Sequence, residues 1–446
     1  MEAYTNYKIT QFLIESYDGS SVIDVTKQVS FVRYYEDVFS PAIFITVGLA
    51  NIESLLTTLT NTKSGMPPGI KGGERVSLEI SQGATGKSIK LDSTANPYYI
   101  YKVHASTTEP TREVFALELC PGQVFTNETT RVLGKYKGNI SSSVISILEK
   151  VLNAKQGKQW LQKNIEITSN NYVFYGNTKR PFSVLTWLCP KSIPSISSGS
   201  SPKEGTAGYL FYQNNEGYNF RSMDSLISGK EQEIETYKYE GKVNDAALPQ
   251  NNFKVITMPV FEKNVNVLEN LRIGMYSTNN YFFDINERQF KAYNYNLKES
   301  YKIMDHSSSK NSPPPLPMDL DSGNHPSRMM VRILDNFSSD PADYPSEGIN
   351  TSKDNTPLYQ AASIARYNLA FSQKLNITVP LNLNLTVGKV IKIDFGVSSL
   401  DDATKGTKDE QKSGYYLIKE LSHVFDKNLG FTGLKLVRDS YGAPSK

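Results

Sequence analysis

The stretch at residues 414–442 constrains the fold more than any other part of the sequence. Residues 415–425 are rich in aromatic and aliphatic side chains without glycine or proline, and residues 431–438 extend again. The residues between them, 426–430, include Asp, Asn and Gly, which tolerate left-handed backbone in tight loops. Two extended runs around a short loop that ends in glycine predict a β-hairpin. Because both faces are partly apolar, we expect protein to cover both, as in the closing strands of a barrel built into an assembly.

Residues 1–122 form a succession of short strand-like segments. The segments are 7–17, 29–37, 41–50, 76–80, 98–104 and 113–120, and a loop rich in glycine and proline occupies 64–73. About seven short strands separated by loops predict a closed or nearly closed antiparallel barrel. This region holds 10 basic and 13 acidic residues. A domain that grips DNA would instead show clustered lysine and arginine.

Residues 123–248 change in character and predict an intervening α+β module. A helix is expected at 139–153, where Asn139 can act as the cap and apolar residues recur at helical spacing. A second, short helix is expected at 181–190, with proline at its first turn and proline at its end. Two strand-like runs around an Asn-Asn-Glu-Gly turn at 209–221 predict a hairpin.

Residues 249–304 and 356–446 predict a second antiparallel β-barrel domain that is split in the sequence. Besides the terminal hairpin, its expected strands are 253–260, 273–285 around a turn at 277–280, 375–385 and 390–395. A helix with proline in its first turn is expected from Thr356 to Ser372. Residues 305–355 cause the split. They are rich in Pro, Ser, Asp and Asn and cannot build a core, so we expect a long insertion loop that is partly ordered at best.

Length and composition bound the class of protein. A chain of 446 residues is too long for one core and should hold two to four domains, and a net charge of +3 indicates no polyelectrolyte partner. The longest near-apolar run, 41–50, is far shorter than the roughly 20 residues of a membrane-spanning helix. The start at Met1 shows no signal peptide, so we expect a protein made in the cytoplasm without a membrane span. Two cysteines, Cys120 and Cys189, indicate a reducing compartment.

Residues able to carry catalysis or bind metal are sparse. The four histidines, His104, His306, His325 and His423, show no metal-ligand spacing, and we interpret His104 and His423 as packing or hydrogen-bonding residues. Cys189 is a conceivable catalytic thiol, but a buried structural cysteine is the favoured interpretation. We therefore expect no enzyme, no catalytic, cofactor-binding or metal-binding residues, and no cofactor.

Three other patterns favour a structural interpretation. The acidic pairs Asp401-Asp402 and Asp409-Glu410 lack the alternating spacing of a calcium loop and fit a solvated surface loop better. The prolines at 313–315 could form a polyproline ligand, but we favour a loop tip. The glycine-containing run at 81–86 lacks the following Lys-Ser/Thr of a phosphate-binding loop.

Aromatic residues cluster at 98–101, 172–175 and 293–295. Such clusters can stack sugars or bases. On strand faces, tyrosine more often marks core edges and protein interfaces, because it combines apolar area with a polar tip. The interface interpretation is favoured.

Several of these segments together resemble a known family. The end reads GYYLIKELSH followed by GFTGLKLVRD, the start contains FLIESYDG before VSFVRYYE, and the middle contains GYLFYQ before GYNF. In this order they resemble the central baseplate hub proteins of contractile-tailed bacteriophages and related injection machines. The resemblance spans nearly the whole chain, and its specificity rests on the order of the segments.

The resemblance implies a fold and a structural role. The fold is mainly β with α+β parts: two tail-tube-type barrels, at 1–122 and at 249–304 with 356–446, flank the α+β module. The role is a homotrimeric hub of pseudo-sixfold symmetry that joins the tail tube to the central spike, initiates tube assembly and forms part of the DNA conduit. The location is the baseplate of the virion tail, assembled in the host cytoplasm.

The resemblance also implies partners. They are other copies of the chain, the central spike protein, the tail tube or tube-initiator protein, other baseplate proteins and the tape measure protein, while DNA passes through without specific binding. No lysozyme-like or needle-like extension follows Lys446, so we expect the spike and any wall-cutting enzyme to be separate chains.

Two other functions stay open from the sequence alone. The tyrosine clusters motivate a carbohydrate-binding tail-tip adhesin, and Cys189 with scattered acidic residues motivates a tail-associated cell-wall hydrolase. A threefold particle without glycan binding would exclude the adhesin. Unchanged activity of a Cys189→Ala variant would remove the best nucleophile of the hydrolase.

Overall fold

The computed structural model covers the whole chain, and part of it is described below. The described residues are 6–16, 19, 22–51, 70, 72–83, 86–92, 97–104, 107–109, 112–154, 163–196, 203–229, 235–239, 255, 258–263, 266–285, 288–307, 326–334, 356–396, 409, 411–426 and 429–440. Within these residues, no helix is both long and apolar enough to cross a membrane.

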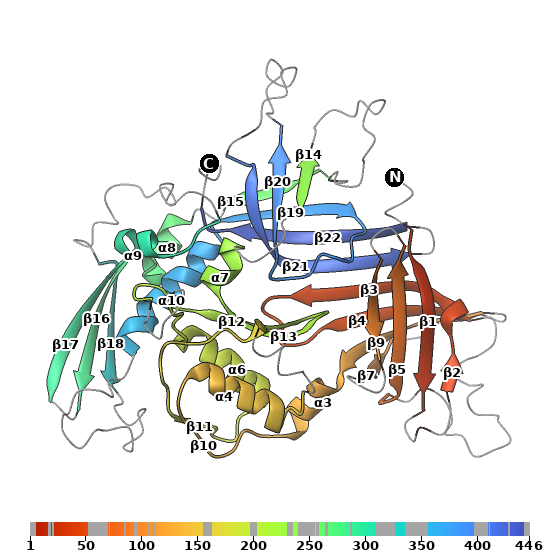
Figure 1. Ribbon diagram of the computed structural model, residues 1–446, viewed down its shortest axis with the longest axis horizontal. Coiled ribbons are helices and arrows are strands. Elements are labelled where there is room, and N and C mark those ends of the chain that lie inside the picture. Colours follow the sequence, from red (N-terminus) through yellow and green to blue (C-terminus); the bar gives the residue numbers. More distant parts are fainter. Residues whose placement is uncertain are drawn as a thin grey trace.

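A single sheet of 15 strands forms the body of the molecule (Figure 1). Its N-terminal strands, beside the short 3-10 turn η1 (Thr26–Gln28), are β1 (Lys8–Glu15), β2 (Val22–Asp24), β3 (Val29–Asp37), β4 (Phe44–Asn51), β5 (Arg75–Gln82), β6 (Lys87–Leu91), β7 (Tyr98–Val103), β8 (Thr107–Glu109) and β9 (Arg112–Pro121). Its later strands are β14 (Thr236–Tyr239), β15 (Val260–Lys263), β19 (Gln373–Pro380), β20 (Val390–Phe395), β21 (Gly414–Asp426) and β22 (Leu429–Arg438). Only β14 and β20 pair in parallel among the described strands of this sheet. The expectation of a mainly β fold is confirmed.

The terminal hairpin and the N-terminal strands meet at one seam. β21 and β22 pair down to Asp426 opposite Leu429, which confirms the predicted hairpin. The other edge of β21 pairs with β3, in a register that runs from Glu420 opposite Asp37 to Asp426 opposite Phe31. Strands from opposite ends of the chain therefore lie side by side (Figure 1).

The strand order differs from two separate closed barrels. Among the described residues, the main path runs from β15 through β19, β22, β21, β3, β4, β9, β7, β5 and β1 to β2, and it stays open. The edge of β3 is hydrogen-bonded to β21 across the seam, and β21 pairs with β22 and β20 as well. One extensive apolar core lines both β regions, with Val32, Leu78, Leu417 and Leu436 among its members.

Glu420 at this seam is expected to make stability depend on pH. Its carboxylate accepts a hydrogen bond from Tyr35 Oη at 2.9 Å, lies 2.7 Å from Lys435 Nζ and also contacts Lys419. Burial alone would raise the pKa of Glu420, but hydrogen bonds from Lys419, Lys435 and Tyr35 outweigh it and lower the pKa to about 2. Stability gained from a lowered pKa is present above the unfolded value of about 4.3 and is lost as the pH falls toward the folded value.

A Glu420→Gln variant should therefore unfold at lower urea concentration than the parent chain at pH 7. The difference should shrink as the pH is lowered from about 5 to about 2, because the parent carboxylate then becomes protonated. Glu79→Gln on β5 makes the same chemical change away from the seam and serves as the control. A difference that stays constant across this pH range would contradict the prediction.

An α+β group of elements follows the first nine strands. Its members are α3 (Gly122–Thr129), β10 (Lys135–Tyr136), α4 (Ile140–Ser146), the π-helical turn η2 (Ile147–Val151), β11 (Phe174–Tyr175), α6 (Pro181–Leu188), the 3-10 turn η3 (Cys189–Lys191), β12 (Tyr209–Asn214), β13 (Gly217–Ser222) and α7 (Met223–Ser228). The predicted helix at 139–153 is present as α4 with η2, although the Asn139 side chain makes no capping hydrogen bond. The predicted helix at Pro181 and the hairpin β12–β13 are also present. The sequence analysis did not predict α3.

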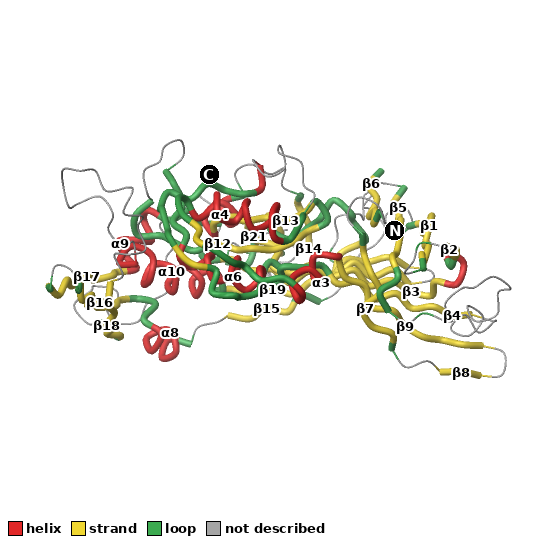
Figure 2. The backbone as a smooth tube through the Cα atoms, turned by 90° about the horizontal axis from the view of Figure 1, so that it is seen from below, coloured by secondary structure: helices red, strands yellow, loops and turns green. Residues whose placement is uncertain are grey.

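A smaller layer lies at the end of the long axis opposite the N-terminal strands (Figures 1 and 2). Its members are α8 (Val267–Ile273), β16 (Ser277–Asp284), β17 (Gln289–Asn296), α9 (Leu297–Ile303), β18 (Arg328–Leu334) and α10 (Thr356–Ala370). β16 is the central strand, antiparallel to β17 and parallel to β18. The helix predicted from Thr356 is confirmed as α10, whose buried side is contributed by Ala361, Ala365 and Leu369.

Two expectations for this layer were wrong. The strand predicted to begin at 273 is instead the end of α8, which Gly274 terminates in left-handed conformation at φ 78°. The turn predicted at 277–280 lies inside β16, because Thr278 Oγ1 donates to the Gly274 carbonyl at 2.8 Å and Asn280 Nδ2 donates to the Tyr293 carbonyl at 3.3 Å. These hydrogen bonds hold both side chains in the extended backbone of β16. β18 was not predicted, and the rest of the loop at 308–325 and 335–355, with the prolines at 313–315, lies outside the described residues.

Candidate functional site

Three of the four histidines lie in the described part of the chain. His423 is buried with Nδ1 at 2.9 Å from Thr432 Oγ1, and burial lowers the pKa of His423 to about 3. His104 Nε2 contacts the Glu118 carboxylate. His325 lies outside the described residues. No group of three or more His, Cys, Asp or Glu within the described ranges is arranged to hold a metal ion.

Both cysteines are buried and free. Cys189 Sγ donates to the Leu185 carbonyl at 3.3 Å, and burial raises the pKa of this thiol far above its ordinary value. Burial also raises the pKa of Cys120 to about 12. The thiolate is the nucleophilic form of cysteine. The environment of Cys189 therefore does not activate it as the hydrolase hypothesis would require.

The aromatic clusters are engaged mainly in packing. Tyr98 is buried, whereas Tyr101 is partly exposed and packs edge-on against Phe44 at 5.9 Å between ring centroids. Tyr172 packs against Trp187 at 5.8 Å, and Tyr175 next to this group is exposed. These rings do not form one stacking platform.

The remaining motif residues carry no ligand geometry where they are described. Asp409 Oδ1 accepts the backbone N–H groups of Gln411 and Lys412, as in an ordinary turn. Asp401-Asp402 and Glu410 lie outside the described residues. In the run at 81–86, residues 81 and 82 end β5, and residues 84 and 85 lie outside the described residues.

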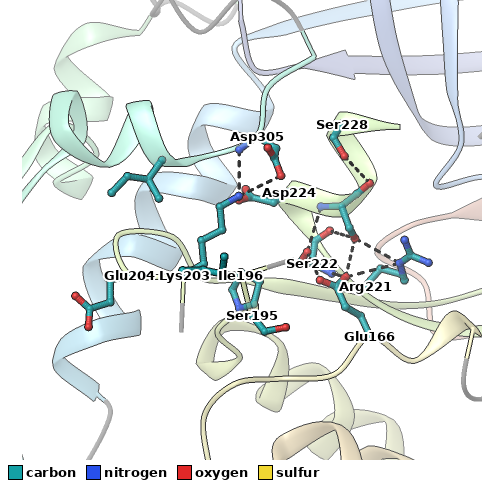
Figure 3. A pocket seen from close by; sticks show the side chains of 13 residues that line it. Glu166, Ser195, Ile196, Lys203, Glu204, Arg221, Ser222, Asp224, Ser228 and Asp305 are labelled. Atoms are coloured by element: carbon teal, nitrogen blue, oxygen red, sulfur yellow. Dashed lines mark hydrogen bonds and ion pairs between the residues drawn. The ribbon is translucent and has the colours of Figure 1, made fainter. Parts of the chain in front are cut away.

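Four charges of alternating sign, three of them buried and one partly buried, join segments that are distant in sequence. Lys203 Nζ lies 2.6 Å from Asp224 Oδ2 and 3.1 Å from Asp305 Oδ2 (Figure 3). Asp224 Oδ1 lies 2.7 Å from Arg366 Nε, and Arg366 Nη1 lies 2.8 Å from Asp439 Oδ2. We call Lys203, Asp224, Arg366 and Asp439 the charge chain. It links the α+β group, α10 and the residue that follows β22.

The Asp439 end of the charge chain is closed by polar contacts. His306 Nδ1 lies 2.8 Å from Asp439 Oδ2, His306 Nε2 lies 2.7 Å from the Tyr301 carbonyl, and Ser307 donates its N–H and its hydroxyl to Asp439 Oδ1 at 3.1 Å. Burial alone would raise the pKa of Asp439, but the hydrogen bond from His306 and the charge of Arg366 outweigh it and lower the pKa well below the usual range. Asp439 therefore stays ionised inside the protein.

An open pocket of about 710 Å³ borders the charge chain (Figure 3). On the far side from Lys203, Glu166 accepts hydrogen bonds from Ser225 Oγ at 2.6 Å, Ser222 Oγ at 2.8 Å and Ser222 N at 2.7 Å. Ser222 in turn accepts the N–H of Ser225 as the N-cap of α7. Glu166 thus helps to fix the helix that carries Asp224. None of the described residues that line this pocket is histidine or cysteine.

Besides the charge chain, a second buried polar network is centred on Glu36 of β3, and we call it the Glu36 joint. Its carboxylate accepts hydrogen bonds from Tyr34 Oη at 2.6 Å, Asn215 N at 2.7 Å, Thr386 Oγ1 at 2.8 Å and Val387 N at 2.9 Å. Burial raises the pKa of Glu36, although these four hydrogen bonds oppose the shift. One side chain thereby ties together the first β region, the turn of the β12–β13 hairpin and the segment after β19.

The sequence analysis predicted neither the charge chain nor the hydrogen bonds around Glu36. Arg366 carried a usable signal, because it is the one charged residue within the helix Thr356–Ala370 and lies on its apolar side. A charge at such a position requires a buried partner. Asp224, Asp439 and Glu36 carried no such signal, since isolated acidic residues are usually solvated.

Comparisons with known proteins give likenesses of structure only. No protein-family model matches the chain, and no curated protein sequence matches it. The solved tail protein from Neisseria meningitidis is 10% identical with a TM-score of 0.49, over 98% of this chain and 100% of that one. The 43 kDa tail protein of a Shewanella oneidensis prophage is 9% identical with a TM-score of 0.48, over 96% and 98%. A type VI secretion system component from Escherichia coli is 9% identical with a TM-score of 0.44, over 99% and 79%. These three solved structures are two tail proteins and a secretion-system component.

Proposed function

We propose that this chain is the structural hub of a contractile-tail baseplate. In this role it forms a homotrimer of pseudo-sixfold symmetry, joins the tail tube to the central spike, initiates tube assembly and lines part of the DNA conduit. The observation that carries the proposal, together with the sequence resemblance, is the seam between β3 and β21. It joins two β-rich regions of one chain edge to edge through the hairpins β3–β4 and β21–β22.

The seam supports a simple symmetry argument. Three copies of a chain that holds two β regions place six such regions around one axis. Such a ring meets a sixfold tube on one side and a threefold spike on the other. The Glu36 joint and the charge chain support the rigidity that this role needs, because they fix the two β regions and the α+β group to one another.

Charge and chemistry are consistent with a structural role in the virion tail. The first β region carries 10 basic and 13 acidic residues, a balance that would not retain DNA in transit. The hub has no chemistry of its own in this proposal. Its partners are the spike, the tube or tube initiator, other baseplate proteins and the tape measure protein.

The particle mass tests the proposal. The purified chain, alone or mixed with the product of the neighbouring spike gene, is expected to form a trimer of about three times 49.9 kDa. Light scattering after size exclusion, or native mass spectrometry, measures this mass directly. A monomer under both conditions would leave the two β regions without a ring to form and would refute the hub function.

A further inference from the structure

The sheet β17–β16–β18 has one covered face and one open face. On the covered face, Phe282 and Leu334 are buried, and Met330 Sδ accepts a hydrogen bond from Gln360 Nε2 of α10 at 3.4 Å. On the other face, Val331 and Met329 are 73% and 68% exposed. Among the described residues, helices pack against one side of this three-stranded sheet only. Both figures place it at one end of the long axis (Figures 1 and 2).

The open face is apolar and uncharged. The strand registers pair Tyr281 with Ala292 and Val331, and Phe283 with Phe290 and Ile333. Alternation along each strand then defines the face, of which the pair Ser277 and Asn296 at one end is left aside because Ser277 is buried. It consists of Asn279, Tyr281, Phe283, Phe290, Ala292, Asn294, Met329, Val331 and Ile333, and we call this set the open face. Seven of these nine side chains are apolar or aromatic, and none is charged.

The strand β18 carries apolar side chains on both faces of the sheet. It pairs in parallel with β16 and contains Met329, Met330, Val331, Ile333 and Leu334 beside Arg328 and Arg332. Met329, Val331 and Ile333 lie on the open side and are exposed in the isolated chain.

The exposed area is large enough for a specific contact. Phe290 is 70% exposed, Ile333 is 57% exposed, and Met329 and Val331 are exposed to a similar degree. Because a large side chain covers on the order of 150–250 Å², the open face offers on the order of 400 Å² of apolar surface. An apolar patch of this size is comparable to the largest one on a typical monomer, which is often functional. It is about half of the roughly 800 Å² that one partner contributes to a standard protein interface.

We propose that the open face is where the next copy of this chain packs in the ring. This inference rests on the proposed function, which requires contact between copies. The chain carries a net charge of +3, so copies repel one another least where the contact surface is uncharged. Interfaces between copies in permanent oligomers are also more apolar than transient ones. A copy of the chain is present wherever the chain is made, which keeps the patch covered by mass action.

A charge on the open face tests the inference. Val331→Lys places an ammonium group where the contact would remove it from water, and the mass is expected to fall from about three times 49.9 kDa to 49.9 kDa. Met329→Glu places the opposite charge on the same face and is expected to have the same effect. Far-UV circular dichroism and the melting temperature of the monomer should stay unchanged, because both side chains are more than half exposed. Leu133→Lys is the matched control at 66% exposure, away from this sheet, and should remain a trimer.

The possible outcomes separate the two proposals. Trimers of the parent chain and of the control, with monomers of both open-face variants, support the inference. A parent trimer that both charge variants preserve overturns the assignment of the open face and leaves the hub function intact. A parent chain that is monomeric alone and with the spike refutes the hub function, and the inference falls with it.

Discussion

Arg366→Leu is expected to lower the free energy of unfolding by about 3–5 kcal/mol. The guanidinium is fully buried, with Nε at 2.7 Å from Asp224 Oδ1 and Nη1 at 2.8 Å from Asp439 Oδ2. Its Nη2 also donates to the Asp305 carbonyl at 2.7 Å. Leucine would leave two carboxylates in the interior with less neutralising charge, and water could not replace the lost partner there. Urea unfolding followed by circular dichroism measures the loss.

An exposed arginine provides the control for this experiment. Arg180 lies 2.9 Å from Glu128, with both side chains about half exposed, and surface pairs of this kind contribute about 0–1 kcal/mol. Arg180→Leu should therefore change stability little. The double variant Arg366→Leu with Asp439→Asn should lose less than the sum of the two single losses, because the groups contact each other. Equal, small losses for Arg366→Leu and Arg180→Leu would show that the charge chain is not desolvated.

Gly388→Ala is the second substitution with a large expected effect, between about 2 and 5 kcal/mol. Gly388 has φ 83°, where a residue with a Cβ costs about 1–2 kcal/mol. The added Cβ would also lie 2.1 Å from Tyr212 Oη and 2.8 Å from Tyr212 Cζ. Tyr212 is buried and cannot swing into solvent, so the contact adds an overpacking cost of about 1–3 kcal/mol. The midpoint of thermal or urea unfolding reports the sum.

Gly86 isolates the backbone part of this effect. It has φ 64°, and nothing lies within 4 Å of the position of an added Cβ. Gly86→Ala should thus cost only about 1–2 kcal/mol. Adding Tyr212→Phe to Gly388→Ala should restore part of the loss, since the nearest clashing atom is removed. If the two glycine variants lose the same stability, Tyr212 adjusts freely and the predicted clash does not exist.

Elements set by neighbouring residues could be predicted from the sequence. The hairpin β21–β22 follows from two apolar runs around an Asp-, Asn- and Gly-containing loop, and β12–β13 follows from its Asn-Asn-Glu-Gly turn. The helices α6 and α10 follow from proline in the first turn and apolar residues at helical spacing. Local chemistry gave the wrong prediction at 277–280, where Thr278 bonds the end of α8 and Asn280 bonds the neighbouring strand β17 instead of forming a turn.

The charge chain and the Glu36 joint could not be predicted from local sequence patterns. The position of Arg366 in its helix indicated a buried partner but not which one. Lys203, Asp224 and Asp439 belong to other segments, and each taken alone is compatible with a solvated charge. The same holds for Glu36, whose partners include backbone N–H groups of Asn215 and Val387. Every residue except proline has a backbone N–H group, so the sequence does not indicate which of these groups will face a carboxylate. Only the fold brings the two together.

The sequence by itself determined which segments become strands and helices, where tight turns occur, and that apolar faces exist on both β regions. Only the tertiary structure decided that β3 pairs with β21, that β18 joins β16 in parallel, and that the main sheet stays open among the described strands. The physical reason is that strand edges present the same N–H and C=O groups whatever the residue, so they do not specify a partner. The partner is selected by the packing of apolar faces that are distant in the chain.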